Sequence, residues 1–308
     1  MMAIKNVIVF GGAGFLGSHV ADELSNQGYC VTIFDIKESP YLRPDQRMVV
    51  GNILDRNSVR EAVSKAEAVF HFAAIADIQE ARDNPVEAAN FNVLGTMYVL
   101  DACREFSIKR FIYASTIYVY SDHGSFYRSS KQACELFIEN YQQEYQIDFT
   151  ILRYGSLYGP RANNFNFIRN CIQMALLEGV INRKGDGEEV RDYINILDAA
   201  KSTVQALSND YKNSYLMITG AQTMKVKELL SMIKEIMNDT IEVNYTNESF
   251  EGHYKITPYS FKPKVALKIT PKDYHDLGQG ILDSIYEIYQ ELIDAGLQPK
   301  TVLGTNKT

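Results

Sequence analysis

The sequence predicts an α/β protein with a doubly wound parallel sheet and a smaller, mixed α/β lobe. Short β-branched runs alternate with segments whose apolar residues recur at helical spacing over roughly the first 150 residues. The first run, residues 6–10, passes through spaced glycines into a helical stretch, which is the order of a parallel βαβ crossover. From Gly155 onward the order becomes mixed, with turn signals at Gly159-Pro160 and Asn163-Asn164.

The individual elements follow from the same periodicities. We expect strands at residues 6–10, 30–34, 48–50, 68–72, 110–114 and 149–152, and helices at residues 19–24, 58–65, 85–106 and 127–145. The apolar positions of the helix at 127–145 are Ala133, Leu136, Phe137 and Tyr141. Later helices are expected at residues 226–237 and 279–295. One domain is therefore placed at residues 1–155 and a second lobe at 156–308, with the segment around 190–210 returning to the first.

Composition and charge narrow the class of protein. The 308 residues carry a net charge of −7, which argues against nucleic acid or an anionic membrane as the main partner. No apolar run is long enough for a membrane span, and no N-terminal segment has a signal-peptide pattern. The four cysteines are scattered without metal-ligand spacing, so they are expected to be buried, reduced thiols. A cytoplasmic enzyme without a metal is the expectation.

The glycines after the first strand indicate a dinucleotide site. Gly14 lets the backbone approach a diphosphate, whose charge is favoured by the N-terminus of the following helix. A glycine cluster alone is weak evidence, since any tight turn uses glycine. However, Asp35 ends the second strand about twenty residues downstream, where a carboxylate accepts hydrogen bonds from the adenosine ribose. Because Asp35 would repel a 2′-phosphate, NAD is expected over NADP, although nearby Lys37 softens that preference.

A second group of residues carries acid–base chemistry. Tyr127 and Lys131 stand four apart at a helix start, which places the phenol and the ammonium on one face. A neighbouring ammonium and a cationic nicotinamide both favour phenolate, so Tyr127 is a candidate base for a sugar hydroxyl. One such pair is expected by chance in a chain with 20 tyrosines. The position of the pair in the chain favours a catalytic role over a chance match, because the pair follows the strand that ends at Thr116. The Thr116 hydroxyl could bind the same sugar oxygen as Tyr127.

These motifs resemble the extended short-chain dehydrogenase/reductases, in particular the NAD-dependent sugar epimerase/dehydratase family, over essentially the whole chain. The resemblance rests on Gly11, Gly14 and Gly17, on Asp35, on Asn52-Ile53, on His71-Phe72-Ala73-Ala74, on Asn92-Val93-Leu94-Gly95-Thr96, on residues 114–120 and 153–160, on Tyr127 with Lys131, and on residues 185–193. It implies a Rossmann-type fold and NAD as cofactor. The catalytic residues it implies are Thr116, Tyr127 and Lys131.

The resemblance also implies binding residues. Those for NAD are Gly11, Gly14, Phe15, Leu16, Gly17, Asp35, Ile36, Asn52, Ile53, Phe72, Ala73, Ala74, Asn92, Tyr127, Lys131 and Tyr154. Those for a nucleotide sugar are Thr116, Ser156, Asn163 and Arg191, with the arginine meeting the diphosphate. A surface salt bridge is the alternative for an arginine of this kind.

Two departures from the family pattern narrow the chemistry. Ile117-Tyr118 stands where the family's 4,6-dehydratases have an Asp-Glu pair, so water elimination is not expected. Only ten residues separate Thr116 from Tyr127, fewer than in typical epimerases of the family. The shorter segment suggests an open pocket, which would release a keto intermediate. The segment at 124–128 is also similar to bacterial GDP-heptose 4-dehydrogenases of capsule pathways.

The resulting functional expectation is NAD-dependent oxidoreduction at C4 of a nucleotide-activated sugar, linked to UDP or GDP, in polysaccharide biosynthesis. Both a 4-epimerase and a 4-dehydrogenase fit this expectation. The alternatives are a net 4-keto-sugar reductase and a non-catalytic NAD-binding sensor or scaffold. The resemblance further implies a homodimer through the helices at 90–106 and 127–145, whose apolar residues could instead serve only the internal core.

Overall fold

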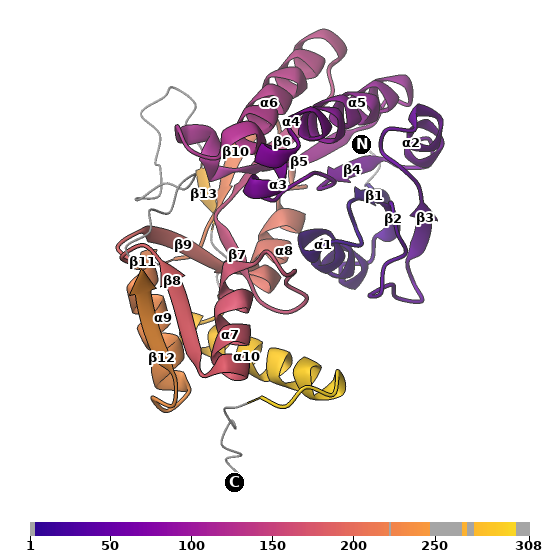
Figure 1. The fold of residues 1–308 in the computed structure, drawn as a ribbon. Helices are drawn as coiled ribbons and strands as arrows, with labels where there is room; N and C mark the ends of the chain where they lie inside the picture. Colours follow the sequence, from indigo (N-terminus) through magenta and orange to yellow (C-terminus); the bar gives the residue numbers. More distant parts are fainter. Residues whose placement is uncertain (1–3, 222, 247–266, 270–273, 300–308) are drawn as a thin grey trace. The chain divides into compact units, whose positions relative to one another are not determined.

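The computed structural model contains an eight-stranded, entirely parallel sheet with the strand order β3-β2-β1-β4-β5-β6-β10-β13 (Figure 1). The structure describes residues 4–221, 223–246, 267–269 and 274–299. The strands of this sheet are β1 (Asn6–Phe10), β2 (Cys30–Asp35), β3 (Arg47–Val50), β4 (Ala68–His71), β5 (Arg110–Thr116), β6 (Phe149–Tyr154), β10 (Ser214–Ile218) and β13 (Leu267–Ile269). The sheet order reverses between β1 and β4, which confirms the predicted doubly wound class.

Helices cover both faces of this sheet. They are α1 (Phe15–Asn26), α2 (Arg56–Val63), α3 (Ile78–Asp83), α4 (Pro85–Ala88), α5 (Gly95–Glu105), α6 (Ser125–Tyr145) and most of α8 (Ile196–Gln205), with short turns of helix at η1 (Ala89–Leu94), η2 (Ile117–Tyr120) and η3 (Asn209–Tyr211). Figure 1 shows α2, α5 and α6 on one side of the strands and α1 and α8 on the other. Apolar side chains of β1, β4 and β5 pack beneath α2, α5 and α6 as one core. This two-sided burial explains the continuous apolar strands in the sequence.

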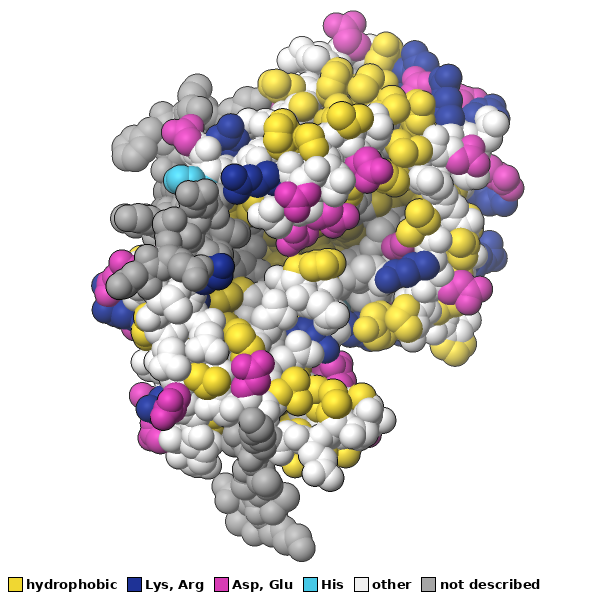
Figure 2. All heavy atoms as spheres, in the orientation of Figure 1, with side chains coloured by type: hydrophobic (Ala, Val, Ile, Leu, Met, Phe, Trp, Pro, Cys, Tyr) yellow, Lys and Arg dark blue, Asp and Glu magenta, His cyan; other side chains and the backbone are white. Residues whose placement is uncertain are grey.

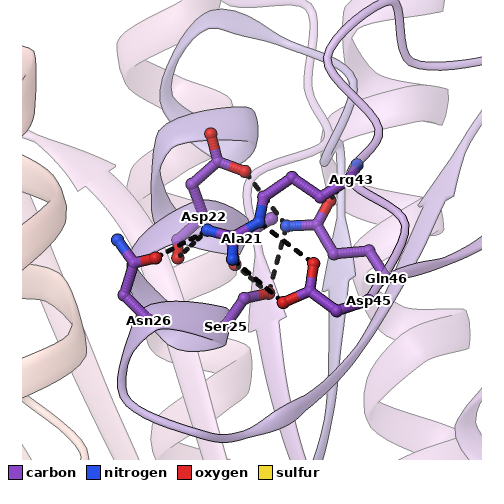
Figure 3. Close-up of polar contacts among 7 residues, drawn as sticks. All are labelled: Ala21, Asp22, Ser25, Asn26, Arg43, Asp45 and Gln46. Carbon is purple, nitrogen blue, oxygen red and sulfur yellow. Dashed lines mark hydrogen bonds and ion pairs between the residues drawn. The ribbon is translucent and has the colours of Figure 1, made fainter.

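A polar cluster fixes the connection between β2 and β3 onto helix α1 (Figure 3). The Arg43 guanidinium donates to Asn26 Oδ1 at 2.6 Å, and the Gln46 amide donates to Asp22 Oδ1 at 3.0 Å. Both acceptors lie on the helix that begins at the glycine loop. The loop that follows Asp35 is therefore held against the helix that follows Gly14.

The predicted helix at 85–106 is interrupted in the structure. It consists of α4, a π-helical turn at η1 and then α5. π turns are uncommon and are frequent at functional sites, because they re-aim single side chains. Here the turn carries Asn92, whose amide is buried.

The buried face of α6 carries Ser130, Lys131, Cys134, Glu135 and Ile138. Of the apolar positions of this helix, Phe137 and Tyr141 pack partly buried against the core, whereas Leu136 is 54% exposed. The expectation of four buried cysteines is wrong for Cys30, which is exposed at the start of β2, while the other three are buried.

A second compact unit comprises residues 155–198 and the later described segments that follow β10, apart from β13. Its strands are β7 (Ser156–Tyr158), β8 (Val180–Lys184), β9 (Val190–Asn195), β11 (Thr223–Lys225) and β12 (Glu242–Thr246), and its helices are α7 (Phe167–Glu178), α9 (Val226–Ile236) and α10 (Leu277–Asp294). They form a β11-β9-β7 sheet, a β12-β8 pair and an apolar core between the three helices. Among the described residues, no helix is both long and apolar enough to cross a membrane.

Candidate active site

The glycine loop between β1 and α1 is packed so closely that two of its glycines admit no side chain. A Cβ on Gly17 would lie 2.1 Å from the carbonyl oxygen of Gly11, and a Cβ on Gly11 would lie 2.5 Å from the backbone nitrogen of Ala73. Gly11 also has a φ of +77°, which strains any residue with a side chain. These two glycines hold the loop against the end of β4.

Gly14 differs from its neighbours because it faces outward. It is exposed, and a Cβ there would meet only the Gly11 carbonyl oxygen, at 3.2 Å. It is also the N-cap of α1 and provides no side chain to cap the helix. The first-turn N–H groups of a helix lack partners within the helix and carry its positive end. The loop therefore fits a diphosphate, whose approach a Gly14 side chain would obstruct.

Asp35 lies at the carboxyl end of β2, beside this loop. Its Oδ2 accepts a hydrogen bond from the Ala13 N–H at 2.9 Å, so the carboxylate helps to fix the loop. The side chain remains partly exposed, and Ile36 beyond it is 62% exposed. Nearby, Asn52 is exposed, while Ile53 is buried against Gly95 of α5. The predicted adenosine-binding residues thus lie around the ends of β2 and β3.

Thr116, Tyr127 and Lys131 come together at the carboxyl end of β5. Thr116 ends that strand, and its side chain hydrogen-bonds the Tyr127 phenol. The Lys131 Nζ lies 5.8 Å from the centre of the Tyr127 ring and donates to the Ala114 carbonyl oxygen at 2.8 Å. Helix α6 supplies the phenol and the ammonium from successive turns, as the sequence spacing predicts. The carboxyl edge of an open parallel sheet is also where such folds bind ligands.

The electrostatics of this cluster are set by burial. Lys131 is 4% exposed, and burial lowers its pKa to about 8, against the opposing effect of Cys134 and Glu135. Burial raises the pKa of Tyr127 to about 12, although the bond from Thr116 lowers it. In the protein on its own, burial thus sets the phenol pKa, and the expected lowering by Lys131 is not seen. A phenolate at neutral pH requires a further positive charge beside the ring.

Residues at the end of β4 and in the π turn form buried hydrogen bonds next to this cluster. His71 is buried, bonds Thr96 Oγ1 at 2.9 Å, and has its pKa lowered to about 3 by burial and by Lys131. It is therefore neutral at physiological pH. The Asn92 amide bonds the backbone of Ile75 and donates to Ser130 Oγ on α6 at 2.9 Å. Asn92 thus joins Ile75, which follows the partly exposed segment Phe72-Ala73-Ala74, to the helix of Tyr127.

A buried polar network, which the sequence pattern did not predict, lies next to Thr116. The Glu135 carboxylate accepts from Ser115 Oγ at 2.6 Å and forms an ion pair with Arg153 at 2.7 Å. Arg153 in turn donates to the Tyr120 hydroxyl. One signal was available, because Glu135 follows Lys131 by one helical turn and Tyr127 by two, and so shares their face.

Of the remaining predicted residues, Tyr154 belongs to the first unit and Ser156, Asn163 and Arg191 belong to the second. Tyr154 ends β6 directly opposite Thr116 of β5, and its hydroxyl bonds Thr203 Oγ1 on α8 at 2.5 Å. In the second unit, Ser156 of β7 lies opposite Tyr193 of β9, so Ser156, Tyr193 and Arg191 occupy one face of that small sheet. Arg191 is buried and donates to the Val190 carbonyl, whereas Asn163 is exposed in the loop after β7.

The parallel sheet, the glycine loop and the Tyr127–Lys131 pair define an oxidoreductase of the extended short-chain dehydrogenase type. The chain belongs to the NAD dependent epimerase/dehydratase family, whose family model matches residues 7–217. This membership confirms the resemblance seen in the sequence, and it confirms NAD at the level of the family.

Curated relatives and a solved structure agree with this assignment. The chain is 30% identical over 290 residues to a putative UDP-glucose 4-epimerase of Methanocaldococcus jannaschii, covering 85% of this chain and 94% of that one. It is 28% identical to a UDP-N-acetyl-alpha-D-glucosaminuronate decarboxylase of Bacillus cytotoxicus, covering 84% and 87%. The UDP-glucuronic acid 4-epimerase of Bacillus cereus, solved with UDP-glucuronic acid and NAD, shares the fold with a TM-score of 0.81 at 23% identity, covering 93% of this chain and 100% of that one.

Proposed function

We propose that the chain binds NAD and a UDP-linked sugar and oxidises the C4 hydroxyl of that sugar, returning the hydride to give the C4 epimer. The observation that carries this proposal is the hydrogen bond between Thr116 and Tyr127, with the Lys131 Nζ 5.8 Å from the centre of the Tyr127 ring. Two hydroxyl groups converge on one point, as a proton transfer from a substrate hydroxyl requires. The names of the relatives support UDP and C4 over the other nucleotides and positions.

In this mechanism Thr116 and Tyr127 together bind the sugar oxygen. Thr116 fixes the direction of the C4 hydroxyl, and Tyr127 Oη accepts its proton as the C4–H bond breaks. Bound NAD would supply the hydride acceptor and a positive charge. The Lys131 ammonium, 5.8 Å from the centre of the Tyr127 ring, would stabilise the phenolate that Tyr127 must become before the transfer. Tyr127 would return the proton to the sugar oxygen when the C4 ketone is reduced.

Two glycines of the loop are expected to have different roles, Gly14 in NAD binding and Gly17 in the stability of the fold. Gly14→Ala is expected to leave the melting temperature unchanged, since its Cβ meets only one atom, at 3.2 Å, but to weaken NAD binding about tenfold or more. Gly17→Ala is expected to cost about 1–3 kcal/mol of stability, because its Cβ would lie 2.1 Å from a backbone oxygen. Thermal unfolding and calorimetric NAD titration check both. Unweakened NAD binding in Gly14→Ala would contradict the assigned role.

Product analysis tests the reaction itself. The protein is incubated with NAD and, separately, with UDP-glucose, UDP-N-acetylglucosamine, UDP-glucuronic acid and GDP-mannose, and the products are analysed by mass spectrometry and NMR. An unchanged mass with inverted C4 is the expected result. Loss of CO₂ from the uronic acid would show that the C4 ketone decarboxylates before it is reduced. No change with any sugar would contradict the proposal, and thermal shifts with the same panel would then test a binding role.

A net 4-dehydrogenase, or its reverse as a 4-keto-sugar reductase, is the second candidate. Only ten residues link Thr116 to Tyr127, and Arg128 ties this segment down by donating to the Ser121 carbonyl at 2.9 Å. Gly124, with a φ of +95°, packs against the Tyr118 ring in the same turn. Such a short, tied segment supports release of the ketone. Loss of two hydrogens in the product assay would identify this reaction.

We further propose that the chain forms a homodimer through α5 and α6. Figure 2 shows hydrophobic side chains gathered over these helices, and the exposed apolar residues on α4, η1 and α6 include Val86, Leu94, Leu136 and Tyr145. Light scattering at micromolar concentration is expected to give the mass of two chains, and Leu136→Glu is expected to give one. A wild-type monomer would contradict the proposed dimer.

A further inference from the structure

We propose that Glu135 and Arg153 are positioning residues for the proposed C4 oxidation: they hold Thr116 and the helix of Tyr127 in one arrangement, and Glu135, which is paired with Arg153, also lies one helical turn from Lys131 as a more distant counter-ion of its ammonium. The inference rests on the proposed function for its effect on turnover. Its geometric basis is independent of any substrate, because every contact lies within the first unit.

A side-chain hydrogen bond joins strand β5 to helix α6. Glu135 lies one turn beyond Lys131 on the buried face of α6. Its Oε1 accepts from Ser115 Oγ at 2.6 Å, and Ser115 immediately precedes Thr116. The carboxylate thus fixes the distance between the strand that ends in Thr116 and the helix that carries Tyr127.

Arg153 connects the Glu135 carboxylate to η2, the helical turn that follows Thr116. Arg153 lies on β6 directly opposite Ser115 and donates two hydrogen bonds to Glu135, at 2.7 and 3.0 Å. Its remaining nitrogen Nη1 donates to the hydroxyl of Tyr120, the last residue of η2. Thr116 caps η2 with its own side chain. The Arg153 guanidinium therefore connects helix α6, which carries Tyr127, to the turn η2, which Thr116 caps.

The Arg153–Glu135 ion pair is deeply buried. Side chains of Arg153 and Glu135 are 1% and 5% exposed, and a buried ion pair of this kind adds little net stability compared with apolar packing. The same two strands also bury Arg110 at their other end, where it is held by Thr150 Oγ1 and by the carbonyls of Phe149 and Ala206. The hydrogen bonds of Arg110 go to neutral acceptors, and Asp148 acts on its charge without a hydrogen bond. Arg153 differs because its two hydrogen bonds to Glu135 join the strand to helix α6.

The surroundings of Lys131 indicate the counter-ion role of Glu135. The groups facing its ammonium are Tyr127 and Cys134 from α6, the Tyr113 ring of β5 at 4.8 Å, and the neutral His71 of β4. Glu135 raises the pKa of Lys131 against the lowering caused by burial. Among the described residues that act on this ammonium, Glu135 is the carboxylate, so it opposes loss of the proton near neutral pH.

NMR of the intact protein labelled with ¹³C-lysine tests the electrostatic part without substrate. The Lys131 signal is assigned by its loss in Lys131→Met, and it is titrated in wild type, Glu135→Gln and Thr150→Val. The last variant removes a neutral bond to buried Arg110 and serves as the matched control. We expect the Lys131 pKa to fall by about one unit in Glu135→Gln and to stay unchanged in Thr150→Val. An unchanged pKa in Glu135→Gln would overturn the counter-ion role.

Steady-state kinetics with the sugar turned over by wild type test the positional part. Tyr120→Phe keeps every charge but removes the bond from Arg153, so it also serves if Glu135→Gln fails to fold. We expect Tyr120→Phe to lower kcat about tenfold with KM and the Lys131 pKa unchanged, and Glu135→Gln to move the alkaline limb of the kcat profile to lower pH. Unchanged kcat in Tyr120→Phe would overturn the positional role. A wild type inactive on all sugars would refute the proposed function, while the NMR result would still decide the counter-ion.

Discussion

Replacing Tyr127 by phenylalanine is expected to lower turnover about 10³-fold or more while leaving NAD binding nearly unchanged. The variant keeps the ring that packs beside Lys131 but removes the only atom of this side chain that can take a proton. Water is a poor substitute at this position, because the phenol oxygen is held by Thr116 at the end of β5. Steady-state rates with the active UDP-sugar and calorimetric NAD titration measure the two quantities.

Tyr141→Phe is the matched control for this change. It lies on the same helix, is also partly buried, and is one of the residues packed against the core behind the sheet. Its kcat is expected to stay within about twofold of wild type. A Tyr127→Phe variant that retains more than about a tenth of wild-type turnover would contradict the role of Tyr127 as base.

Lys131→Met is expected to abolish turnover and yet to stabilise the protein at pH 7. Burial lowers the Lys131 pKa to about 8 from the 10.5 of an exposed lysine, so holding the ammonium in the folded protein costs up to about 3 kcal/mol. Methionine removes that cost, but it leaves the Ala114 carbonyl without its hydrogen-bond donor. The lost bond destabilises the variant by about 1 kcal/mol. A net gain of about 2 kcal/mol is expected at pH 7, seen as a higher melting temperature.

The pH dependence of this gain follows from the direction of the pKa shift. Below pH 8 lysine is charged in both the folded and unfolded chain, and the gain is constant. Between pH 8 and 10.5 the unfolded chain binds more protons than the folded one, so wild type becomes more stable with rising pH and the gain decreases. Lys65→Met, at an exposed position, serves as control and is expected to show no such trend. A stability difference for Lys131→Met that does not vary between pH 7 and 10 would contradict the account.

The architecture of the first unit could be predicted because its strands are buried on both faces. Short apolar runs between helical segments mark β1, β2, β4, β5 and β6 in the sequence, and the structure confirms each of them. The small sheets of the second unit could not be assigned in this way. Strands such as β7 and β11 have three residues each, and their partners are set by tertiary contacts rather than by any local pattern.

Local spacing predicted the Thr116, Tyr127 and Lys131 cluster, but not the contacts that support it. The Tyr127–Lys131 pair can be seen from an interval of four on one helix. The Ser115–Glu135–Arg153 network depends instead on the register of β5 with β6, which places residues 38 positions apart side by side. The buried face of α6 could not be predicted from apolar spacing for a related reason. Its polar residues are buried because each has a hydrogen-bond partner, as Lys131 has in the Ala114 carbonyl and Glu135 in Ser115, while the apolar Leu136 is exposed.

The most direct test of C4 oxidation by Tyr127 is the fate of deuterium placed at C4 of the UDP-sugar that the NAD-loaded protein converts. We predict that wild type keeps the deuterium at C4 of an inverted product, or transfers it to the reduced cofactor when the ketone is released, and that Tyr127→Phe does neither at a measurable rate. Conversion that loses the deuterium to solvent, or that proceeds equally well in Tyr127→Phe, would contradict this mechanism.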